Sequence, residues 1–546
     1  MHSPLNAIAR AATLSCLAFA SVLCAAGQPA ASAPSQPSTR AGAAEPDHGS
    51  EARAARAYDQ AMREGPLAVN AFLHQFPKGA DLHVHLSGAV YAETLIRDAA
   101  EDGACVDTVA LAIVQPPCAD NLIPAKRFSG NIDRQTQLLY DKLIDALSIR
   151  SFVPSAGWST HDQFFAVFDR TSGLKDHNGE WVDEVASRAV AQNQQYLELM
   201  VTPPFTHAVG IASEIGWDPE LAQADPRAFA QFRQQLLDKG LRDEVAADRE
   251  AALTAETQRK QLEHCGTAQA APACQVEVRY IWTVLRDFAP EQVFAQALLG
   301  FETVEASIEA RDPGFVGINF VRPEDDFVTM RDYTLQMKMV GYLHSVYPKV
   351  HISLHAGELV PGLVPPEGLR FHVRQAVETA HAERIGHGVD IMYEDDPQGL
   401  LREMAEKHIM VEINLSSNEG ILGVKGDMHP FPIYRTAHVP VALSTDDEGV
   451  SRIEITHEYT RAAVDYNLTY RDLKQLARTG MEHDFLPGDS LWAEPDQFTV
   501  ARGACRGQVL GSDKPSAACK PFLDGSEKAA AQWELERRFR VFEAKF

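Results

Sequence analysis

Basic residues are scarce in this sequence relative to acidic ones. Its 546 residues include 50 lysines and arginines against 75 aspartates and glutamates, which gives a formal net charge of −25 at pH 7. Such a charge repels the phosphates of nucleic acids and anionic membrane surfaces. The composition therefore argues against a nucleic-acid polymer as a partner.

Several diagnostic patterns are also missing. We find no convincing internal repeat and no nucleotide-binding glycine loop. His381 and Glu383 match half of the cytidine-type deaminase signature, but the P-C-x-x-C that completes its zinc site is absent. The apolar run over residues 11–26 is short for a permanent membrane helix, so no stable membrane insertion is expected.

The N-terminal region is typical of an exported protein. A weakly basic segment around Arg10 precedes the apolar run, and small residues and proline follow it. This layout predicts a signal peptide over residues 1–26 and an Ala/Ser/Pro-rich flexible linker over residues 27–50. We expect a periplasmic or secreted protein. A lipoprotein attached at Cys24 is the minor alternative, because the bulky Leu23 precedes that cysteine.

Six cysteines follow the predicted signal peptide, in three pairs that are local in sequence. Disulfides persist in exported proteins, so an even number of paired cysteines favours bridges over free thiols. Other pairings remain open from sequence alone. The expected bridges are Cys105–Cys118, Cys265–Cys274 and Cys505–Cys519.

Eight apolar runs have strand character, and helical or irregular segments separate them. The runs cover residues 78–86, 196–202, 276–285, 315–321, 350–357, 384–389, 409–415 and 439–447. Alternation of strands with helices predicts an α/β protein of the (β/α)8 TIM-barrel class.

Two connections are much longer than a simple crossover requires. They follow the first and second strands, over residues 90–195 and 203–274, and are expected as helical insertions over the catalytic face. The remaining predicted parts are a helical segment over 51–77, a barrel over 78–490 and a C-terminal extension over 491–546.

Chemistry-bearing residues stand at the ends of the predicted strands. His83 and His85 alternate on one strand and so share a face, about 6.6 Å apart along the chain. Later strands end in "SLHAGE", "RIGHGVD" and "ALSTDDEG". Taken singly, each motif also fits a buried core histidine, a turn or a helix cap. In a parallel barrel, however, all of these strand ends open on one face.

Three imidazoles and one carboxylate form a suitable set for a zinc ion with an open coordination position. Such an ion lowers the pKa of water to about 7. The motifs leave one further carboxylic acid, one histidine and one aspartate, which suit proton donation, proton removal and ligand orientation.

The blocks "KGADLHVHLSGA", "LHAGE", "RIGHG" and "ALSTDDEG", in this order, resemble the signatures of the adenosine deaminase family within the metal-dependent amidohydrolase superfamily. The resemblance extends with interruptions from Lys78 to Gly488, and it is greatest to secreted bacterial members. It implies a (β/α)8 barrel that converts adenosine to inosine and ammonia with one Zn²⁺ per chain. The implied zinc ligands are His83, His85, His355 and Asp446.

The resemblance also implies the other roles. Glu358 would protonate N1 of the purine, and His387 would orient the attacking water and take its proton. Asp447 would hydrogen-bond N7, and Ser87 and Gly88 would lie at the substrate.

Two positions depart from the family pattern. Ser87 replaces an aspartate that helps to hold the ribose 5′-hydroxyl, and Arg322 replaces a glycine whose amide lies near purine N3. Arg322 would meet a phosphate, pair with Glu324 or Asp325, or shift the loop. The alternatives are therefore a deaminase of another 6-aminopurine (adenine, deoxyadenosine or an adenine nucleotide) and a secreted purine-binding barrel without catalysis. The sequence does not fix the oligomeric state.

Overall fold

The computed structural model describes residues 48–218 and 221–546. The predicted signal peptide, Cys24 and residues 27–47 of the predicted linker lie outside this range. The end of the linker prediction is wrong, because α1 (His48–Glu64) includes residues 48–50. Glu51 favours the helix start, and Ala54 and Tyr58 bury one face of the helix, so it extends further upstream than the sequence indicated.

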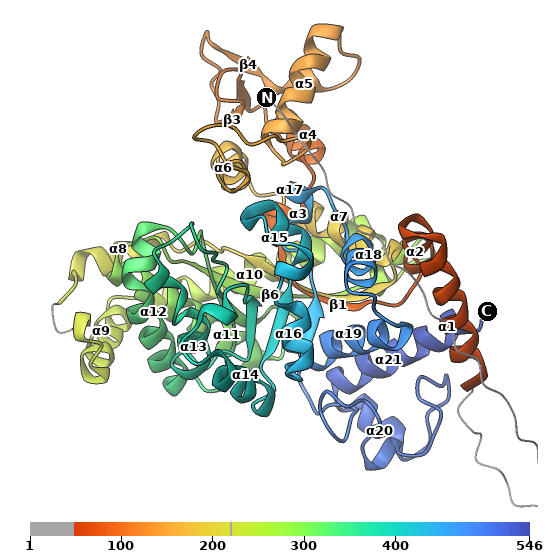
Figure 1. Cartoon of the computed structure of the whole chain (residues 1–546). Coiled ribbons are helices and arrows are strands. Elements are labelled where there is room, and N and C mark those ends of the chain that lie inside the picture. The colour runs from red at the N-terminus through yellow and green to blue at the C-terminus, as the bar shows by residue number, and fades with distance from the viewer. Residues whose placement is uncertain (1–47, 219–220) are drawn as a thin grey trace, which may run out of the picture. The chain divides into compact units, whose positions relative to one another are not determined.

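Eight parallel strands form the barrel, which confirms the predicted fold (Figure 1). They follow one another in chain order: β1 (Gly79–His85), β5 (Gln194–Val201), β6 (Glu277–Leu285), β7 (Phe315–Val321), β8 (His351–Ala356), β9 (Arg384–His387), β10 (Met410–Ile413) and β11 (Val441–Leu443). Hydrogen bonds from His85 N to Asp446 O (3.2 Å) and from Asp446 N to His83 O (2.8 Å) close the ring between the last strand and the first.

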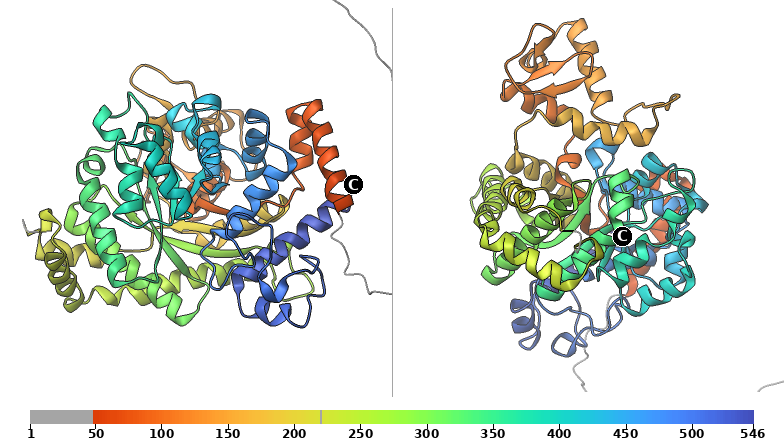
Figure 2. Two further views of the ribbon diagram at one scale, coloured as in Figure 1. Left: turned by 60° about the horizontal axis from the view of Figure 1, so that its bottom comes forward. Right: turned by 90° about the vertical axis from the view of Figure 1, so that its left-hand side faces the viewer.

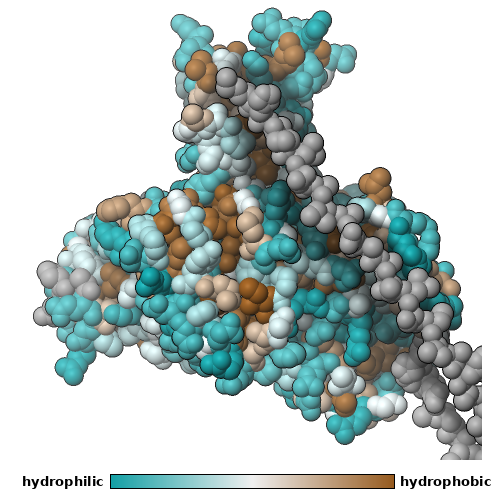
Figure 3. Space-filling view, in the orientation of Figure 1, coloured by the Kyte–Doolittle hydropathy of each residue, from teal (hydrophilic) through white to brown (hydrophobic). Residues whose placement is uncertain are grey.

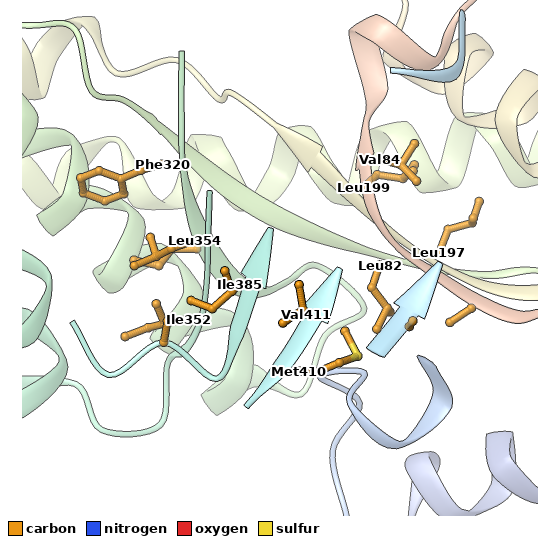
Figure 4. Packing of buried hydrophobic residues seen from close by; sticks show 14 of the residues in the cluster. Leu82, Val84, Leu197, Leu199, Phe320, Ile352, Leu354, Ile385, Met410 and Val411 are labelled. Carbon is orange, nitrogen blue, oxygen red and sulfur yellow. The ribbon is translucent and has the colours of Figure 1, made fainter. Parts of the chain in front are cut away.

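Side-chain alternation along β1 separates the apolar core from the site. Leu82 and Val84 belong to the large buried apolar cluster, as do Ile352, Leu354 and Ile385 of later strands (Figure 4). His83 and His85, on the opposite face of the same strand, contact residues across the barrel interior.

Helices surround the strands in both views of Figure 2. Those that follow the later strands are α11 (Pro290–Ala310), α12 (Phe327–Val346), α13 (His372–Glu378), α14 (Pro397–Glu406), α15 (Leu415–Leu422), α16 (Phe431–Thr436), α17 (Glu448–Ser451), α18 (Ile455–Asp465) and α19 (Tyr470–Glu482). At the N-terminal side, α2 (Pro66–Leu73) packs against α1 and α18.

Both predicted insertions are present. The first holds α3 (Leu86–Ala89), α4 (Ala92–Glu101), α5 (Arg134–Ala146), α6 (Thr160–Thr171), α7 (Asn178–Ala191) and an antiparallel sheet of β2 (Cys105–Asp107), β3 (Ala112–Val114) and β4 (Leu122–Pro124). The second holds α8 (Thr206–Ile215), α9 (Pro226–Asp238) and α10 (Val245–Leu262).

The C-terminal extension has its own small apolar cluster around Trp492, which includes Cys505 and Cys519. It contains α20 (Cys519–Asp524) and α21 (Glu527–Glu543), and α21 packs on α19 and α1. All three predicted disulfides are formed. Hydrophilic residues predominate on the face shown in Figure 3. Within the described residues, no helix has the length and apolarity needed to cross a membrane.

Candidate metal and catalytic centre

Four predicted metal ligands converge inside the barrel. One ligand atom from each of His83, His85, His355 and Asp446 lies within 4.8 Å of the others. Nε2 of His85 is 3.2 Å from Nε2 of His355 and 3.4 Å from Oδ1 of Asp446. The four side chains come from β1, β8 and the residues after β11, which lie far apart in sequence.

Hydrogen bonds on the outer ring nitrogens orient two of these histidines. Nδ1 of His83 is 2.5 Å from Oε2 of Glu412, and Nδ1 of His355 is 2.7 Å from Oδ1 of Asn319. Because both acceptors require Nδ1–H, Nε2 is the atom that each ring offers to the centre of the site. Nε2 of His83 has no hydrogen-bond partner among the described residues, although it is buried.

The three imidazoles and the Asp446 carboxylate face one centre, where Asp446 and Glu412 outweigh burial and raise the pKa of His83 to about 10, so the site favours a positive charge there. Burial lowers the pKa of His85 to about 4 and holds that of His355 well below its usual value, which keeps both rings neutral. Three imidazoles and a carboxylate are the donor set that Zn²⁺ prefers when a position stays open for water. The residues present therefore fit such an ion.

Glu412 is itself fixed by a buried ion-pair network. Nε of Arg384 lies 2.7 Å from Oε1 of Glu412, and Ser353 donates to the same oxygen at 2.9 Å. On its other side, Arg384 Nη2 lies 2.6 Å from Oε2 of Glu198. The network thus connects the core of the barrel to the His83 ring.

Glu358 lies beside the cluster in the loop after β8. The buried carboxylate of Glu324 holds this loop by accepting hydrogen bonds from Gly357 N (3.0 Å) and Glu358 N (2.8 Å). Burial, with the nearby charge of Asp446, raises the pKa of Glu358 well above its usual value. The raised pKa favours the protonated form of Glu358, which can donate a proton.

Asp447 and Gly88 contact each other. A Cβ atom on Gly88 would lie 1.6 Å from Oδ1 of Asp447, so only glycine leaves room for that carboxyl group. Burial, with the charge of Asp446, raises the pKa of Asp447 well above its usual value. Ser87 is exposed and lines the cavity, whereas Gly88 does not line it and makes space for Asp447.

A cavity of about 560 Å³ opens over this centre. His85, His355, Glu358, His387, Asp446 and Asp447 line its inner part. Phe164, Phe165 and Phe168 of α6 add aromatic walls, and α7 and α10 also contribute. Both insertions therefore shape the cavity, as the sequence indicated.

Arg322 lines the cavity in a strained conformation. Its φ of 94° lies in the left-handed region that favours glycine, the residue that the family pattern places here. Arg286 stabilises this conformation by donating two hydrogen bonds to the Arg322 carbonyl, at 3.2 and 3.0 Å. The guanidinium lies 3.4 Å from Asp287, so its ion pair is not with Glu324 or Asp325, which was one of the alternatives open from the sequence.

Comparison of the sequence with known protein families agrees with this site. The adenosine deaminase family model matches residues 160–493, more than half of the chain. The chain belongs to the adenosine deaminase family. His355, Glu358, His387, Asp446 and Asp447 all fall within the matched range.

The individual curated relatives match only part of this chain, at modest sequence identity. This family member is 29% identical to the adenosine deaminase of Clostridium perfringens strain ATCC 13124 over 168 residues, which are 31% of this chain and 43% of that protein. It is 34% identical to the adenosine deaminase of Escherichia coli strain SMS-3-5 over 140 residues, which are 26% of this chain and 39% of that protein. The chain thus spans less than half the length of these curated relatives.

Among solved structures, a zinc-bound amidohydrolase from Burkholderia ambifaria shares the fold. Its TM-score is 0.50 at 17% sequence identity, and the alignment covers 87% of this chain and 94% of that one. This likeness concerns the fold alone.

The structure adds residues that the sequence did not single out. Asn319, Glu412 and Ser417 contact the predicted ligands, the last through a 2.6 Å hydrogen bond to Asp446. Glu324, which the sequence offered only as a partner of Arg322, holds the Glu358 loop. For Glu412 the sequence did hold a signal, because it is an acidic residue inside the apolar strand "IMVEINL".

Proposed function

We propose that this adenosine deaminase family member hydrolyses the 6-amino group of a purine nucleoside, with adenosine as the leading substrate. Water and adenosine would yield inosine and ammonia. The observation that carries the proposal is that a complete metal-ligand set and the buried carboxyl group of Glu358 lie in one cavity. Zn²⁺ held by His83, His85, His355 and Asp446 would lower the pKa of water to about 7.

The other side chains would act on the purine. The Glu358 carboxyl group would donate its proton to N1, which makes C6 more electrophilic. Asp447, whose pKa burial raises, would in its protonated form donate a hydrogen bond to N7 and fix the ring orientation. His387 would hydrogen-bond the attacking water. A protein that only binds purines would need neither the raised pKa of Glu358 nor the adjacent histidine.

Electrostatics favour a nucleoside over a nucleotide. Arg322 is the one lysine or arginine among the described cavity-lining residues, and Asp287 neutralises it. Asp169 and Asp176 lie exposed on the outer part of the cavity lining. A phosphate would meet carboxylates there without a free cation, which disfavours its binding.

We also propose that the protein is exported. The proposal rests on the N-terminal pattern of residues 1–26 and on three disulfides, which persist in oxidising compartments. Cell fractionation with N-terminal sequencing of the mature chain tests it. A cytoplasmic chain that retains Met1 would contradict it.

A substrate panel tests the activity. Zinc-loaded full-length protein is incubated with adenosine, deoxyadenosine, adenine and AMP, and kcat/KM is measured from the ultraviolet absorbance change. We expect adenosine or deoxyadenosine to exceed AMP by at least about tenfold. Preference for AMP would refute the nucleoside assignment, and no turnover of any 6-aminopurine would refute the catalytic proposal.

A further inference from the structure

A chain of hydrogen bonds leads from the backbone of α16 to the catalytic centre. Phe431 N lies 3.1 Å from Nδ1 of His429, and Nε2 of His429 lies 3.0 Å from Oδ1 of Asn418. Nδ2 of Asn418 is then 2.9 Å from Nδ1 of His387. His429, Asn418 and His387 are each at most 2% exposed.

The Phe431 amide fixes which atoms donate and which accept along this series of hydrogen bonds. A backbone N–H can only donate, so Nδ1 of His429 is an acceptor and carries no proton. Burial lowers the pKa of His429 to about 3, so the ring is neutral and its one proton is on Nε2. That N–H donates to the carbonyl oxygen of Asn418, which leaves the amide N–H₂ of Asn418 facing His387.

The amide therefore donates to Nδ1 of His387, which must be an unprotonated acceptor. Nδ1 of His387 also lies 3.4 Å from the amide nitrogen of Asn414 and 3.4 Å from Oε1 of Glu358, so Asn418 at 2.9 Å is the nearest of these three neighbours. The neutral His387 ring then carries its proton on Nε2. This atom is buried without a hydrogen-bond partner among the described residues, and His387 lines the cavity.

We propose that Asn418 and His429 are positioning residues that keep Nε2 of His387 protonated. His387 then donates a hydrogen bond to the attacking water and orients it. This differs from the proton-accepting role that the family resemblance implies, because Nε2 already holds a proton. The inference rests on the proposed function for its catalytic meaning, but the position of the proton can be measured independently of activity.

Two variants of His429 separate this role from packing. His429→Gln retains an N–H donor toward Asn418, whereas His429→Leu is similar in size and has no donor. We expect His429→Gln to keep kcat within about threefold and His429→Leu to lower it at least about tenfold, with KM and zinc content unchanged in both. Equal kcat values for the two variants, or a greater loss with Gln, would overturn the proposal.

A spectroscopic measurement covers the case in which a variant does not fold. The ¹⁵N chemical shifts of ¹⁵N-histidine-labelled, zinc-loaded full-length protein report which ring nitrogen is protonated, and His387→Gln identifies the His387 signals by their loss. We expect Nε2 to be protonated and Nδ1 not. Asn418→Asp should move the proton to Nδ1, because a carboxylate there accepts a hydrogen bond.

Protonated Nδ1 in the unmodified chain would overturn the inference. If that chain turns over no 6-aminopurine, the proposed function fails, while the chemical shifts still decide the position of the proton on His387.

Discussion

Replacing Glu412 by glutamine should weaken zinc binding without removing any metal ligand. Arg384 and Ser353 both contact Oε1 of Glu412, so in Glu412→Gln they hold the amide oxygen on their side. The amide N–H₂ then faces Nδ1 of His83, where the carboxylate now lies at 2.5 Å. A donor in that place forces the His83 proton toward Nε2, the nitrogen that must bind the metal.

Loss of such an outer-shell partner typically costs about 10- to 100-fold in metal affinity, or about 1.4–2.8 kcal/mol. We expect the upper half of that range, because the variant reverses the hydrogen bond instead of only removing it. The assay is competition for Zn²⁺ with a chromophoric chelator, using full-length protein at pH 7.5.

Glu198→Gln is the matched control. It disturbs the other buried ion pair of Arg384, at 2.6 Å, but does not contact His83. Both variants should lower stability, since each uncouples a buried charge. We expect Glu198→Gln to change zinc affinity by less than about threefold. Equal weakening in the two variants would refute the role of Glu412 and indicate a general effect of destabilisation.

Three further predictions follow from other parts of the structure. Glu358→Gln should retain zinc but lower kcat by about 10²- to 10⁴-fold, because the glutamine side chain has no acidic proton to donate. Steady-state kinetics and metal analysis test this prediction, and a joint loss of activity and zinc would contradict it. Arg322→Gly should be more stable to urea than Arg322→Ala by about 1 kcal/mol, because only alanine keeps the strain of φ 94°; equal midpoints would contradict it. Burial lowers the pKa of His429 to about 3, so below pH 6.5 the unfolded chain binds a proton there that the folded chain excludes, and the free energy of unfolding decreases as the pH falls. Between pH 7 and pH 5, the free energy of unfolding of His429→Gln, measured with urea, should decrease by about 2 kcal/mol less than that of the unmodified chain. Identical decreases would contradict the assignment.

The sequence predicted the barrel well because its strands carry a local signal. Apolar runs such as "FVGINFV" are strands at the predicted residues, 315–321. The candidate metal ligands could also be picked out, because His83 and His85 follow the two-residue period of a strand. Partners across the barrel were not, since the contact of His83 with Glu412 joins residues that are 329 positions apart and depends on the closed ring.

Loop conformations likewise could not be predicted from the sequence. The sequence identified Arg322 as unusual, but its ion pair with Asp287 depends on a backbone conformation that Arg286 stabilises from the end of the neighbouring strand. His429 had no predicted role, because its partner Asn418 lies on α15 and the direction of their hydrogen bond is set by the Phe431 amide.

The most direct test of the central claim is ammonia release from adenosine by purified full-length protein, compared between zinc-loaded, chelator-treated and Glu358→Gln samples. We predict release equimolar with inosine in the zinc-loaded sample, loss on chelation with recovery on adding Zn²⁺, and near-complete loss in Glu358→Gln. Undiminished release after complete metal removal, or no release from the zinc-loaded protein, would contradict the account.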